Sequence, residues 1–545
     1  MAVLSSRRSQ MKPGPEGAVR RHVTDGLLLF ILVFVTFAVS VNAFWATDHA
    51  TSLTQLDYAL FSQRSVALGH ASSVPPWSVD DFHYGGQNYS ALAPGTAFFA
   101  LPFAALAFTL AGGYTAYGPV LLLTETFVSL AGALAAYVVY KICDLYFRRS
   151  TSIFVGLAFA FSTVCWPFAT YFFQSDVSAL FVLSAIYFAI RANRTDNGNL
   201  LLIASGLAVG AAFTVDYVNA IITPILLGFI LIRKGRKWRA TLASAGALLL
   251  GALPGAAAIA LYNHAIFGNP FMTTEGAYLG RSLLGEFSTP LLYGLSLNLV
   301  SLSRGVFAFA PFAVLGVLGF VDGIRSKGAR REMLLMLAVF LGVLLPYSAW
   351  YDPQGGLSFG PRFLVAGIPF LLVPSGYIIE QVRGRREVLI YGVYGVGALI
   401  NGMAAFVTAV PPLTNFDVSP FLTYVVPNFV KGNFDSLWAS YVGSSLAVGA
   451  LLVAVVGIAL PISWIVRVRR RELKSIEAPK PRPAPGIARA STGSGLVSHG
   501  VLTTPESPRP SGDTPRATAG FEKFSLREGL TDQPKSEQLD RALRP

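Results

Sequence analysis

Apolar stretches long enough to cross a lipid bilayer recur along most of this 545-residue sequence. A transmembrane helix needs about 20 predominantly apolar residues to span roughly 30 Å of hydrocarbon. Only 13% of the residues are charged, whereas a soluble domain carries about a quarter. The pattern predicts an all-α polytopic membrane protein of about twelve transmembrane helices. The predicted spans are residues 27–45, 119–140, 152–170, 176–192, 199–215, 217–232, 240–262, 305–321, 333–350, 363–380, 388–410 and 440–466.

The basic residues indicate which way the chain faces. Lys and Arg are enriched in the short loops on the cytoplasmic side of a membrane protein. If the apolar stretch 96–112 is short, interfacial or re-entrant, all but five of the 42 Lys and Arg residues fall on one side. We therefore predict a plasma-membrane protein with both termini in the cytoplasm. The five basic residues left outside or at the outer boundary are Arg64, Arg281, Arg304, Arg362 and Lys431.

The same placement accounts for the net charge of +13. A basic chain can indicate a nucleic-acid partner, but here the charge lies beside predicted membrane spans. We therefore predict no nucleic-acid partner and contact with membrane lipids instead. The two cysteines lie in or beside apolar stretches, so they offer neither a disulfide framework nor a metal cluster.

The chain divides into three predicted parts. Residues 1–25 form a basic cytoplasmic N-terminus, residues 26–466 the transmembrane domain, and residues 467–545 a cytoplasmic tail. The tail is rich in Pro, Ser, Gly and Arg and has no apolar periodicity, which is typical of disorder. Within the transmembrane domain, the two largest outer loops are 46–95 and 264–304.

Carboxylates in and near the outer loops are the first candidates for chemistry. Asp48 follows the first span by three residues, and Asp176 lies in a very short outer turn. Asp57 and Arg64 are seven residues apart, so on a helix they share one face. The apolar residues around them predict an amphipathic helix on the bilayer surface, with Asp57 and Arg64 as part of it. The alternative for Asp48 and Asp57 is a solvated surface charge.

Two arginines stand at the outer start of a predicted span, each near glycine. Arg304 lies in the segment SRG and Arg362 ends the segment GGLSFGPR. A guanidinium can hold a phosphate by paired hydrogen bonds, and glycine lets backbone amides approach an anion. The sequence therefore predicts phosphate binding by both arginines. The alternative is that they anchor the chain at lipid headgroups.

The order of these features resembles the GT-C superfamily of lipid-carrier-dependent glycosyltransferases, and within it the protein O-mannosyltransferase-like group. The shared features are an acidic residue after the first span, a juxtamembrane G-x-x-Y-S-x-x-x-P-G segment, a short acidic turn, a long outer loop and two glycine-containing segments. In this sequence they are Asp48, residues 86–95, Asp176, and residues 264–304, 303–305 and 355–362. The resemblance extends over roughly residues 25–380.

The resemblance implies a GT-C-like fold and transfer of a sugar from a polyprenyl-phosphate donor to an acceptor at the outer face. The acceptor, a protein, lipid or glycan, is not identified. Asp48 would act as the base on the acceptor or as a metal ligand, with Asp57 as the alternative, and Asp176 would be the second-turn acid. The implied contacts are Arg304 and Arg362 with the donor phosphate, and Arg64, Tyr89 and Ser90 with the substrate.

The chain departs from the family pattern at its acids. It has no adjacent Asp-Glu pair after the first span and no acidic pair in the second turn. A divalent metal therefore stays open as a cofactor, and no other cofactor is implied.

The main alternative is a transporter or lipid flippase of the same helix number. Transporters are commonly built from two repeated halves, with broken helices and charges near the bilayer midplane. This sequence has no detectable repeat, few such charges, and a loop of about 50 residues after its first predicted helix. A third reading is a scaffold that has kept the architecture without catalysis. Loss of activity on substitution of Asp48 or Asp176 separates an enzyme from that scaffold.

Overall fold

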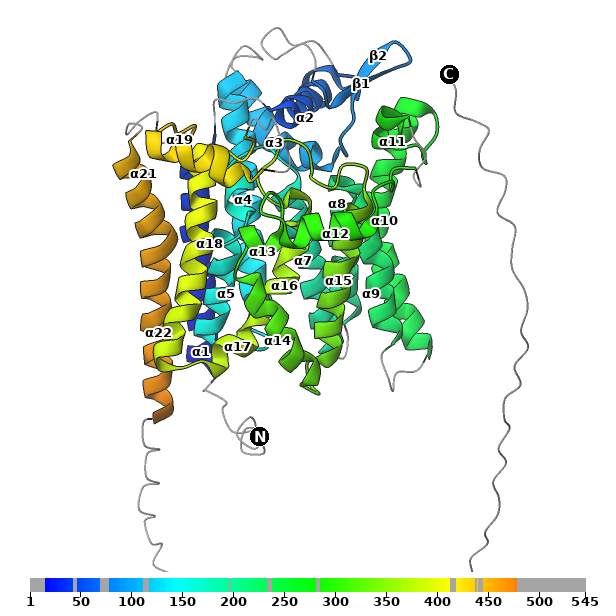
Figure 1. Ribbon diagram of the computed structural model, residues 1–545. Coiled ribbons are helices and arrows are strands. Elements are labelled where there is room, and N and C mark those ends of the chain that lie inside the picture. The colour runs from blue at the N-terminus through cyan, green and yellow to red at the C-terminus, as the bar shows by residue number, and fades with distance from the viewer. Residues whose placement is uncertain are drawn as a thin grey trace, which may run out of the picture. The chain divides into compact units, whose positions relative to one another are not determined.

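The computed structural model describes residues 15–42, 47–68, 78–110, 117–195, 198–232, 238–280, 285–411, 418–436, 439 and 445–477. These residues form a helical bundle with a two-stranded sheet at one end (Figure 1). Most of the predicted disordered tail lies outside the described residues, as does Arg281.

Six helical segments of the described chain are long and apolar enough to cross a membrane. They lie in α4 (Tyr117–Cys143), α7 (Ser175–Asn193), α10 (Trp238–Phe267), α15 (Arg330–Ala349), α18 (Glu387–Val407) and a continuous run through α21 (Leu446–Leu452), η6 (Val453–Ala459) and α22 (Leu460–Glu477). Shorter apolar helices are α1 (Pro15–Val39), α3 (Gly95–Leu110), α5 (Arg149–Phe161), α8 (Asn199–Val215), α9 (Ile222–Leu231) and α12 (Leu291–Val300).

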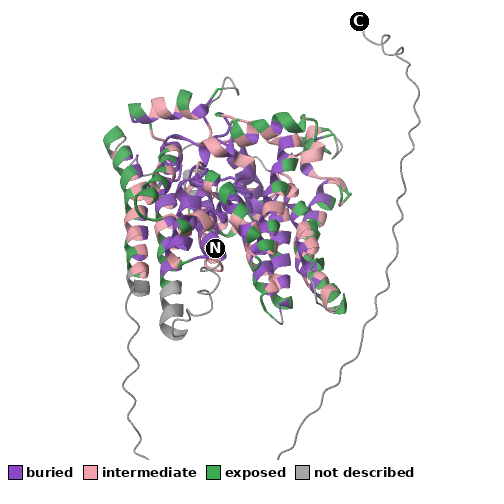
Figure 2. Cartoon of the chain, turned by 60° about the horizontal axis from the view of Figure 1, so that its bottom comes forward, coloured by how far each residue is buried: buried purple, intermediate pink, exposed green. Residues whose placement is uncertain are grey.

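The surface of the bundle suits a lipid environment. Buried residues gather in its interior, and exposed residues lie on the outward sides of the helices (Figure 2). On α10 the exposed residues include Leu249, Leu250 and Leu253, which in water would be an unfavourable apolar surface. The prediction of an all-α polytopic membrane protein is confirmed, whereas the number of twelve spans is not.

Three predicted spans are interrupted, and a fourth changes from a 3₁₀-helix to an α-helix without a break. Residues 152–170 divide into α5 and α6 (Cys165–Phe168), and 217–232 into η2 (Tyr217–Ile221) and α9. Residues 305–321 divide into α13 (Val306–Phe309) and α14 (Ala313–Arg325). Residues 363–380 divide into η3 (Arg362–Leu364), α16 (Ile368–Leu372) and α17 (Ser375–Gln381). Pro311 and Pro374 stand at two of these breaks, because proline has no N–H to continue a helical ladder.

The first outer loop packs as a small layer of its own at one end of the bundle. It contains α2 (Asp48–Tyr58), η1 (Ala59–Gln63), and an antiparallel hairpin of β1 (Asp81–Tyr84) and β2 (Gln87–Ser90). Gly85 and Gly86 close the hairpin with φ of +56° and +82°, values that glycine adopts without strain. The doubtful stretch 96–112 corresponds mainly to α3, which lies beside α2 at this end rather than running through the bundle (Figure 1).

Two expectations for this loop differ from the structure. α2 does not lie with one polar face in water: it is buried from His49 to Asp57, because α3 and β2 pack against it. Asp57 and Arg64 do not share a face, since Asp57 is buried and Arg64 is exposed. The helix widens into the π-helical η1 and then ends at Arg64, whose φ is +52°. Residues seven apart therefore no longer lie on one face of an α-helix.

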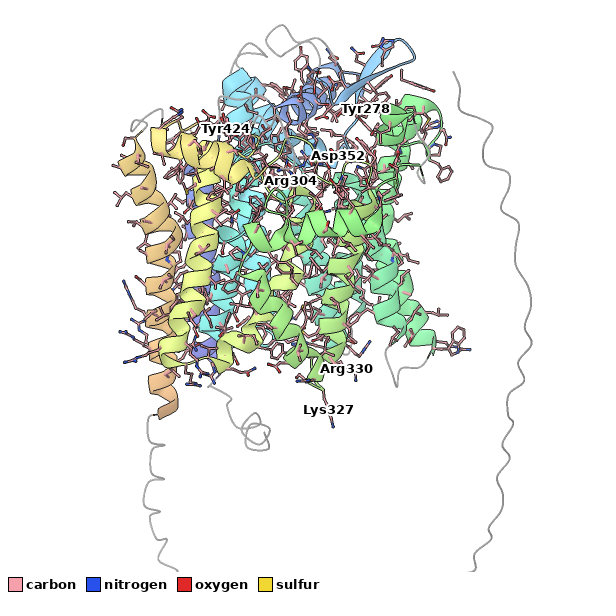
Figure 3. All side chains as sticks on the ribbon, in the orientation of Figure 1. Tyr278, Arg304, Lys327, Arg330, Asp352 and Tyr424 are labelled. Atoms are coloured by element: carbon pink, nitrogen blue, oxygen red, sulfur yellow. The ribbon has the colours of Figure 1, made fainter. Side chains whose placement is uncertain are left out.

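Ion pairs tie the helices together at the opposite end of the bundle. Arg194 Nη2 lies 2.6 Å from Glu332 Oε2, and Arg149 pairs with Asp25. Arg469 of α22 lies 3.3 Å from Glu387. The helix α22 itself continues to Glu477, past the predicted start of the tail at residue 467. Lys327 and Arg330 lie at this same end, which Figure 3 shows below the bundle.

Short helices cover the end that carries the first outer loop. They are α11 (Thr274–Leu279), η5 (Phe421–Val425) and α19 (Val426–Lys431), while the 3₁₀ turn η4 (Gly384–Arg386) precedes α18 at the other end. Tyr278, Asp352 and Tyr424 lie near these covering segments, at the end of the bundle away from Lys327 (Figure 3). The end that carries the first outer loop is covered by short helices, and the candidate functional groups lie there.

The helices α8 and α10 approach each other unusually closely at glycine. A Cβ added at Gly206 would lie 2.0 Å from the carbonyl oxygen of Leu248, and one at Gly251 would lie 2.2 Å from that of Ile203. Small residues allow such close helix contact inside a membrane, where packing replaces the hydrophobic effect. The glycines are therefore a structural requirement of this helix pair.

We expect Gly206→Ala to lower the thermal stability of the detergent-solubilised protein. The added methyl group cannot be accommodated without separating two backbones, and overpacking of this kind costs about 1–3 kcal/mol. The matched control is Gly246→Ala on α10, because no atom lies within 4 Å of a Cβ there. Size-exclusion chromatography after heating measures both variants. Equal stability of the two would contradict the close approach of α8 and α10.

Candidate functional site

A cavity of about 620 Å³ opens at the end of the bundle that carries the first outer loop. Its volume falls within the range of roughly 300–1,000 Å³ that is typical of ligand sites. It is lined by the start of α2, the turn before β1, the segment after β2, the connection from α6 to α7, α11 and the loop from 350 to 363, and also by Thr408, Val410, Tyr424 and Asp435. Its carboxylates are Asp48, Asp80, Glu275, Asp352 and Asp435.

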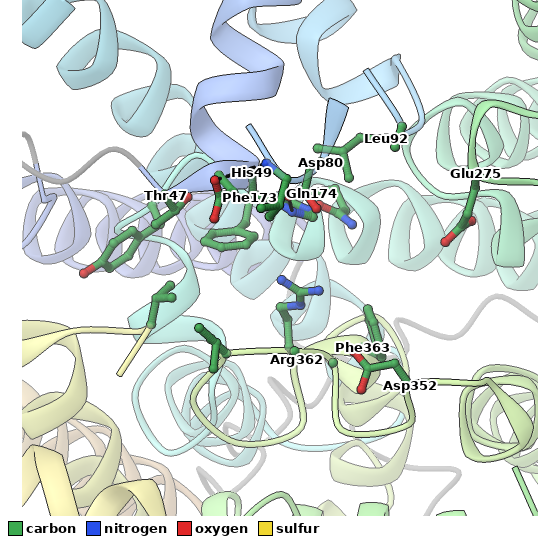
Figure 4. Close-up of a pocket in the computed structure, with 18 of the residues that line it drawn as sticks. Thr47, His49, Asp80, Leu92, Phe173, Gln174, Glu275, Asp352, Arg362 and Phe363 are labelled. Carbon is green, nitrogen blue, oxygen red and sulfur yellow. Dashed lines mark hydrogen bonds and ion pairs between the residues drawn. The ribbon is translucent and has the colours of Figure 1, made fainter. Parts of the chain in front are cut away.

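Among the described residues, Arg362 is the one arginine that lines this cavity. Its guanidinium carbon lies 5.3 Å from the centre of the Phe173 ring and 4.9 Å from that of Phe363. Its Nε is buried and has no hydrogen-bond partner among the described residues. Stacking occupies the faces of a guanidinium and leaves the N–H groups at its edge available. The side chain reaches into the cavity toward Asp80 and His49 (Figure 4).

The two rings beside Arg362 are themselves stacked. Phe363 lies 4.4 Å from the ring of Tyr347, with an angle of 7° between the planes. Phe173 lies 4.8 Å from the ring of His49, with an angle of 24°. Arg362 therefore forms part of a stack that joins the first outer loop to α15. Such a stack fixes the guanidinium in position before a ligand arrives.

His49 connects the first outer loop to the start of α7. Its Nδ1 lies 2.6 Å from Asp80 Oδ2, and its Nε2 lies 2.7 Å from Gln174 Oε1. Burial by itself would raise the pKa of Asp80, but the charge and hydrogen bond of His49, with the charge of Arg362, hold the pKa below its usual value. Asp80 is therefore a carboxylate at neutral pH and a weak base.

Asp48 stands at the exposed rim of the cavity, as the first residue of α2. The N-cap is Thr47, whose side-chain oxygen accepts a hydrogen bond from the Ala50 N–H at 3.0 Å. The Val79 N–H donates to Asp48 Oδ1 at 3.3 Å. Asp48 therefore has a defined orientation with most of its carboxylate open to the cavity and to solvent, as an acceptor of a proton requires.

Glu275 of α11 provides a carboxyl group of different character. Burial, followed by the charges of Asp216, Glu286 and Asp80, raises the pKa of Glu275 to about 8. Burial also raises the pKa of Asp352, against the opposing charge of Arg362. At neutral pH Glu275 is therefore largely protonated and can donate a hydrogen bond to a ligand.

Arg304 does not line the cavity but lies directly behind its wall. The side chain is fully buried and donates to the carbonyl oxygens of Gln354, Ser303 and Gly356 at 2.9, 3.0 and 3.1 Å. Gly355 and Gly356, which do line the cavity, have φ of +72° and +64°. Arg304 therefore holds the shape of the loop, and each nitrogen of its guanidinium already donates to a backbone carbonyl oxygen.

The remaining predicted site residues lie outside the cavity. Tyr89 is buried against Phe82, and Ser90 Oγ lies 2.7 Å from Ser52 Oγ, so both hold the hairpin on α2. Arg64 is exposed at the end of η1.

Asp57 and Asp176 are both fully buried. The two carboxylate oxygens of Asp57 have no hydrogen-bond partner among the described residues, and burial raises its pKa well above the usual range. Asp176, in the first turn of α7, lies beside Cys165. Neither carboxyl group lines the cavity, although Gln174, two residues before Asp176, does.

The sequence pointed to Asp48 and Arg362, and both line the cavity. It did not point to most of the residues that surround them there. Asp80 stands in the same first loop as Asp48, in the segment VDDF, and Glu275 stands in the second large outer loop. Their positions in outer loops were the available signal, but other acids shared it. His49 and Phe173 had no signal of their own, because their roles depend on contacts across the fold.

The described residues do not offer a ready metal site. No group of three or more His, Cys, Asp or Glu side chains among them is placed to hold a metal ion. Of the cavity carboxylates, Asp80 is engaged by His49, and burial raises the pKa of Glu275 and of Asp352. This donor set does not fit a divalent cation, which prefers several ionised oxygen ligands. The side chains of the cavity are therefore the groups that could act in catalysis.

One protein family and several solved structures are similar to this chain. The family described as dolichyl-phosphate-mannose-protein mannosyltransferase matches residues 106–262. No curated protein matches the sequence. The crystal structure of ArnT from Cupriavidus metallidurans bound to undecaprenyl phosphate is similar, with 14% identity, a TM-score of 0.50, and coverage of 83% of this chain and 76% of that one.

A second similar structure is the archaeal oligosaccharyltransferase AglB from Archaeoglobus fulgidus in complex with an inhibitory peptide and a dolichol-phosphate. It is 12% identical, has a TM-score of 0.45, and the match covers 71% of this chain and 56% of that one. The family match and the ArnT fold confirm the resemblance carried by the sequence motifs. Over most of its length, this chain shares the fold of ArnT.

Proposed function

We propose that this protein is a membrane glycosyltransferase that moves a sugar from a polyprenyl-phosphate carrier to an acceptor at the outer face of the membrane. The observation that carries the proposal is the state of Arg362. Its guanidinium lies between two aromatic rings, faces a cavity of about 620 Å³, and keeps a buried Nε without a hydrogen-bond partner among the described residues. A guanidinium binds a phosphate group by charge-assisted hydrogen bonds, which are often bidentate.

The arrangement supports an inverting transfer. An acceptor hydroxyl attacks the anomeric carbon of the donor, and the bond from that carbon to the phosphate oxygen breaks. The leaving group is the polyprenyl phosphate, and Arg362 stabilises its growing negative charge. Asp48 takes the proton of the acceptor hydroxyl, because it is the solvent-facing carboxylate of the cavity.

Other cavity groups suit contacts with the sugar. Trp350, Tyr351 and Tyr278 offer aromatic surface, and protonated Glu275 offers a hydrogen-bond donor. Sugars present apolar faces and hydroxyl edges, which these two kinds of group recognise. The structural similarity to ArnT, which was solved with undecaprenyl phosphate, supports a lipid-linked donor.

The side of the membrane follows from the basic residues. Lys327 and Arg330 lie at the end of the bundle away from the cavity (Figure 3). Arg149, Arg194 and Arg469 form ion pairs at this end. Because basic loops stay in the cytoplasm, we place the cavity outside and both termini inside the cell, in the plasma membrane.

We expect a cysteine placed at Tyr84 to react with a membrane-impermeant maleimide on intact cells. A cysteine placed at Lys327 should react only after permeabilisation, because the two positions lie at opposite ends of the bundle. Both positions are exposed, and the native Cys143 and Cys165 are buried free thiols that give little background. The opposite labelling pattern would place the cavity in the cytoplasm and remove the outer-face assignment.

The test of the activity uses the full chain in proteoliposomes. A polyprenyl phosphate carrying a radiolabelled hexose is added with a membrane extract that supplies acceptors. We expect label to leave the carrier, free polyprenyl phosphate to accumulate, and Arg362→Ala to abolish both. Movement of intact labelled lipid across the bilayer without loss of sugar would favour the flippase and contradict a transferase.

A further inference from the structure

Asp80 and Arg362 carry opposite charges and line the same cavity, yet they do not pair. The charge of Arg362 lowers the pKa of Asp80, so the two groups lie within electrostatic reach of each other. Nevertheless, Arg362 forms no ion pair within 4.0 Å among the described residues. A buried guanidinium that stays unpaired beside a carboxylate is an unfavourable arrangement. Another contact must therefore hold the two groups apart.

A hydrogen bond from His49 holds the carboxylate of Asp80. The Nδ1–H of His49 donates to Asp80 Oδ2 at 2.6 Å, which is the one side-chain hydrogen bond of that carboxylate that the structure describes. On the backbone, the Asp80 N–H donates to Ser78 Oγ at 3.0 Å, and its carbonyl oxygen accepts from the Ala91 N–H at 2.8 Å. The backbone of Asp80 is thus fixed, and the direction of its side chain is decided by His49.

The ring of His49 is fixed in turn on two further sides. Its Nε2 lies 2.7 Å from Gln174 Oε1, and its face stacks on Phe173 at 4.8 Å. The amide of Gln174 can turn to accept from or donate to Nε2, so this contact persists in either protonation state of the imidazole. Phe173 is also the ring that lies 5.3 Å from the guanidinium of Arg362.

We infer that His49 is a positioning residue that holds Asp80 away from Arg362 and so keeps the guanidinium free to bind an anion. The inference rests on the proposed function, in which that anion is the phosphate of the donor. In the absence of the imidazole, the side chain of Asp80 turns to the nearest fixed cation, which is Arg362. A phosphate must then displace Asp80 before it binds.

The consequence for affinity follows from the population of free Arg362. Apparent affinity falls in proportion to the fraction of molecules whose site is competent. If nine molecules in ten contain the new Asp80–Arg362 pair, binding weakens about tenfold. Removal of the Asp80 charge restores competence even without His49. A merely structural role of His49 predicts no such rescue.

The test measures binding of undecaprenyl phosphate to the detergent-solubilised full chain by native mass spectrometry. His49→Phe keeps a ring that can stack on Phe173 but removes both nitrogens, and we expect it to weaken binding about tenfold or more. The double variant His49→Phe/Asp80→Asn should bind within about threefold of wild type. The matched control is His83→Phe, which makes the same change at an exposed histidine of β1 that bonds Asn88 and does not line the cavity, and it should stay within about threefold of wild type.

Two results overturn the inference: unchanged binding by His49→Phe, or an equal defect in the double variant. If His49→Phe does not fold, Asp80→Asn alone decides, because it should bind as tightly as wild type or more tightly, and weaker binding contradicts the role assigned to Asp80. Equal binding by Arg362→Ala and wild type is a failure of the proposed function instead. A cryo-EM structure of His49→Phe tests the inference without any ligand, since Asp80 should then lie within 4.0 Å of Arg362.

Discussion

Arg362→Ala is expected to weaken the binding of undecaprenyl phosphate by about 30- to 3,000-fold. Truncation of one partner in a buried, hydrogen-bonded charge pair costs about 2–5 kcal/mol, and each 1.4 kcal/mol is about tenfold in affinity. The effect is large because Arg362 is the one arginine of the described residues that lines the cavity, and because Arg304 is buried behind the cavity wall. All of the described hydrogen bonds of the Arg304 guanidinium go to backbone carbonyl oxygens of the chain.

Two control variants make this result specific. Arg362→Lys keeps the charge but loses the planar fork and the stacking on Phe173 and Phe363, so we expect an intermediate loss. Arg383→Ala removes an exposed arginine next to η4 and should leave binding unchanged. Native mass spectrometry in detergent measures all three. Wild-type affinity in Arg362→Ala would show that the phosphate does not bind at this guanidinium.

Asp48→Asn is expected to lower the rate of sugar transfer by about 10²–10⁴-fold, the usual contribution of a general base. Asparagine preserves the size of the side chain and can still accept the hydrogen bond from the Val79 N–H. It cannot take a proton from the acceptor. Binding of undecaprenyl phosphate should change by less than about threefold, because Asp48 stabilises the transfer step rather than the bound donor.

The matched control for Asp48 is Asp57→Asn in the same helix. Asp57 is fully buried outside the cavity, and burial raises its pKa well above the usual range, so an amide should leave transfer nearly unchanged. The assay follows radiolabelled sugar from its carrier into acceptor. Full activity of Asp48→Asn would contradict its role as the base and move that role to another of the cavity carboxylates.

The membrane architecture could be predicted from the sequence because its signals are local. The length of an apolar run decides whether it can cross the bilayer, and the charge of a short loop decides its side. The interrupted spans could not be predicted with the same certainty. Residues 305–321 and most of 363–380 are apolar, so they have the pattern of a continuous span, but helix breaks at Pro311 and Pro374 divide them.

The site was predictable only in part, for a related reason. Asp48 and Arg362 stand in short motifs next to predicted spans, and both line the cavity. Arg304 has the same local pattern, but its side chain turns inward to the loop at 354–356, which no spacing reveals. His49 acquires its role from Asp80 and from Gln174 at the start of α7, contacts that join positions far apart in the sequence.

The most direct test of the account is a cryo-EM map of the full chain with undecaprenyl phosphate bound. We expect the phosphate in the cavity with its oxygens about 2.7–2.9 Å from the guanidinium nitrogens of Arg362, the distance of a charge-assisted hydrogen bond. Asp80 should remain on His49, and Asp48 should face the space beside the phosphate. A phosphate bound away from Arg362, or at the end of the bundle beside Lys327, would contradict the assignment of this cavity as the donor site.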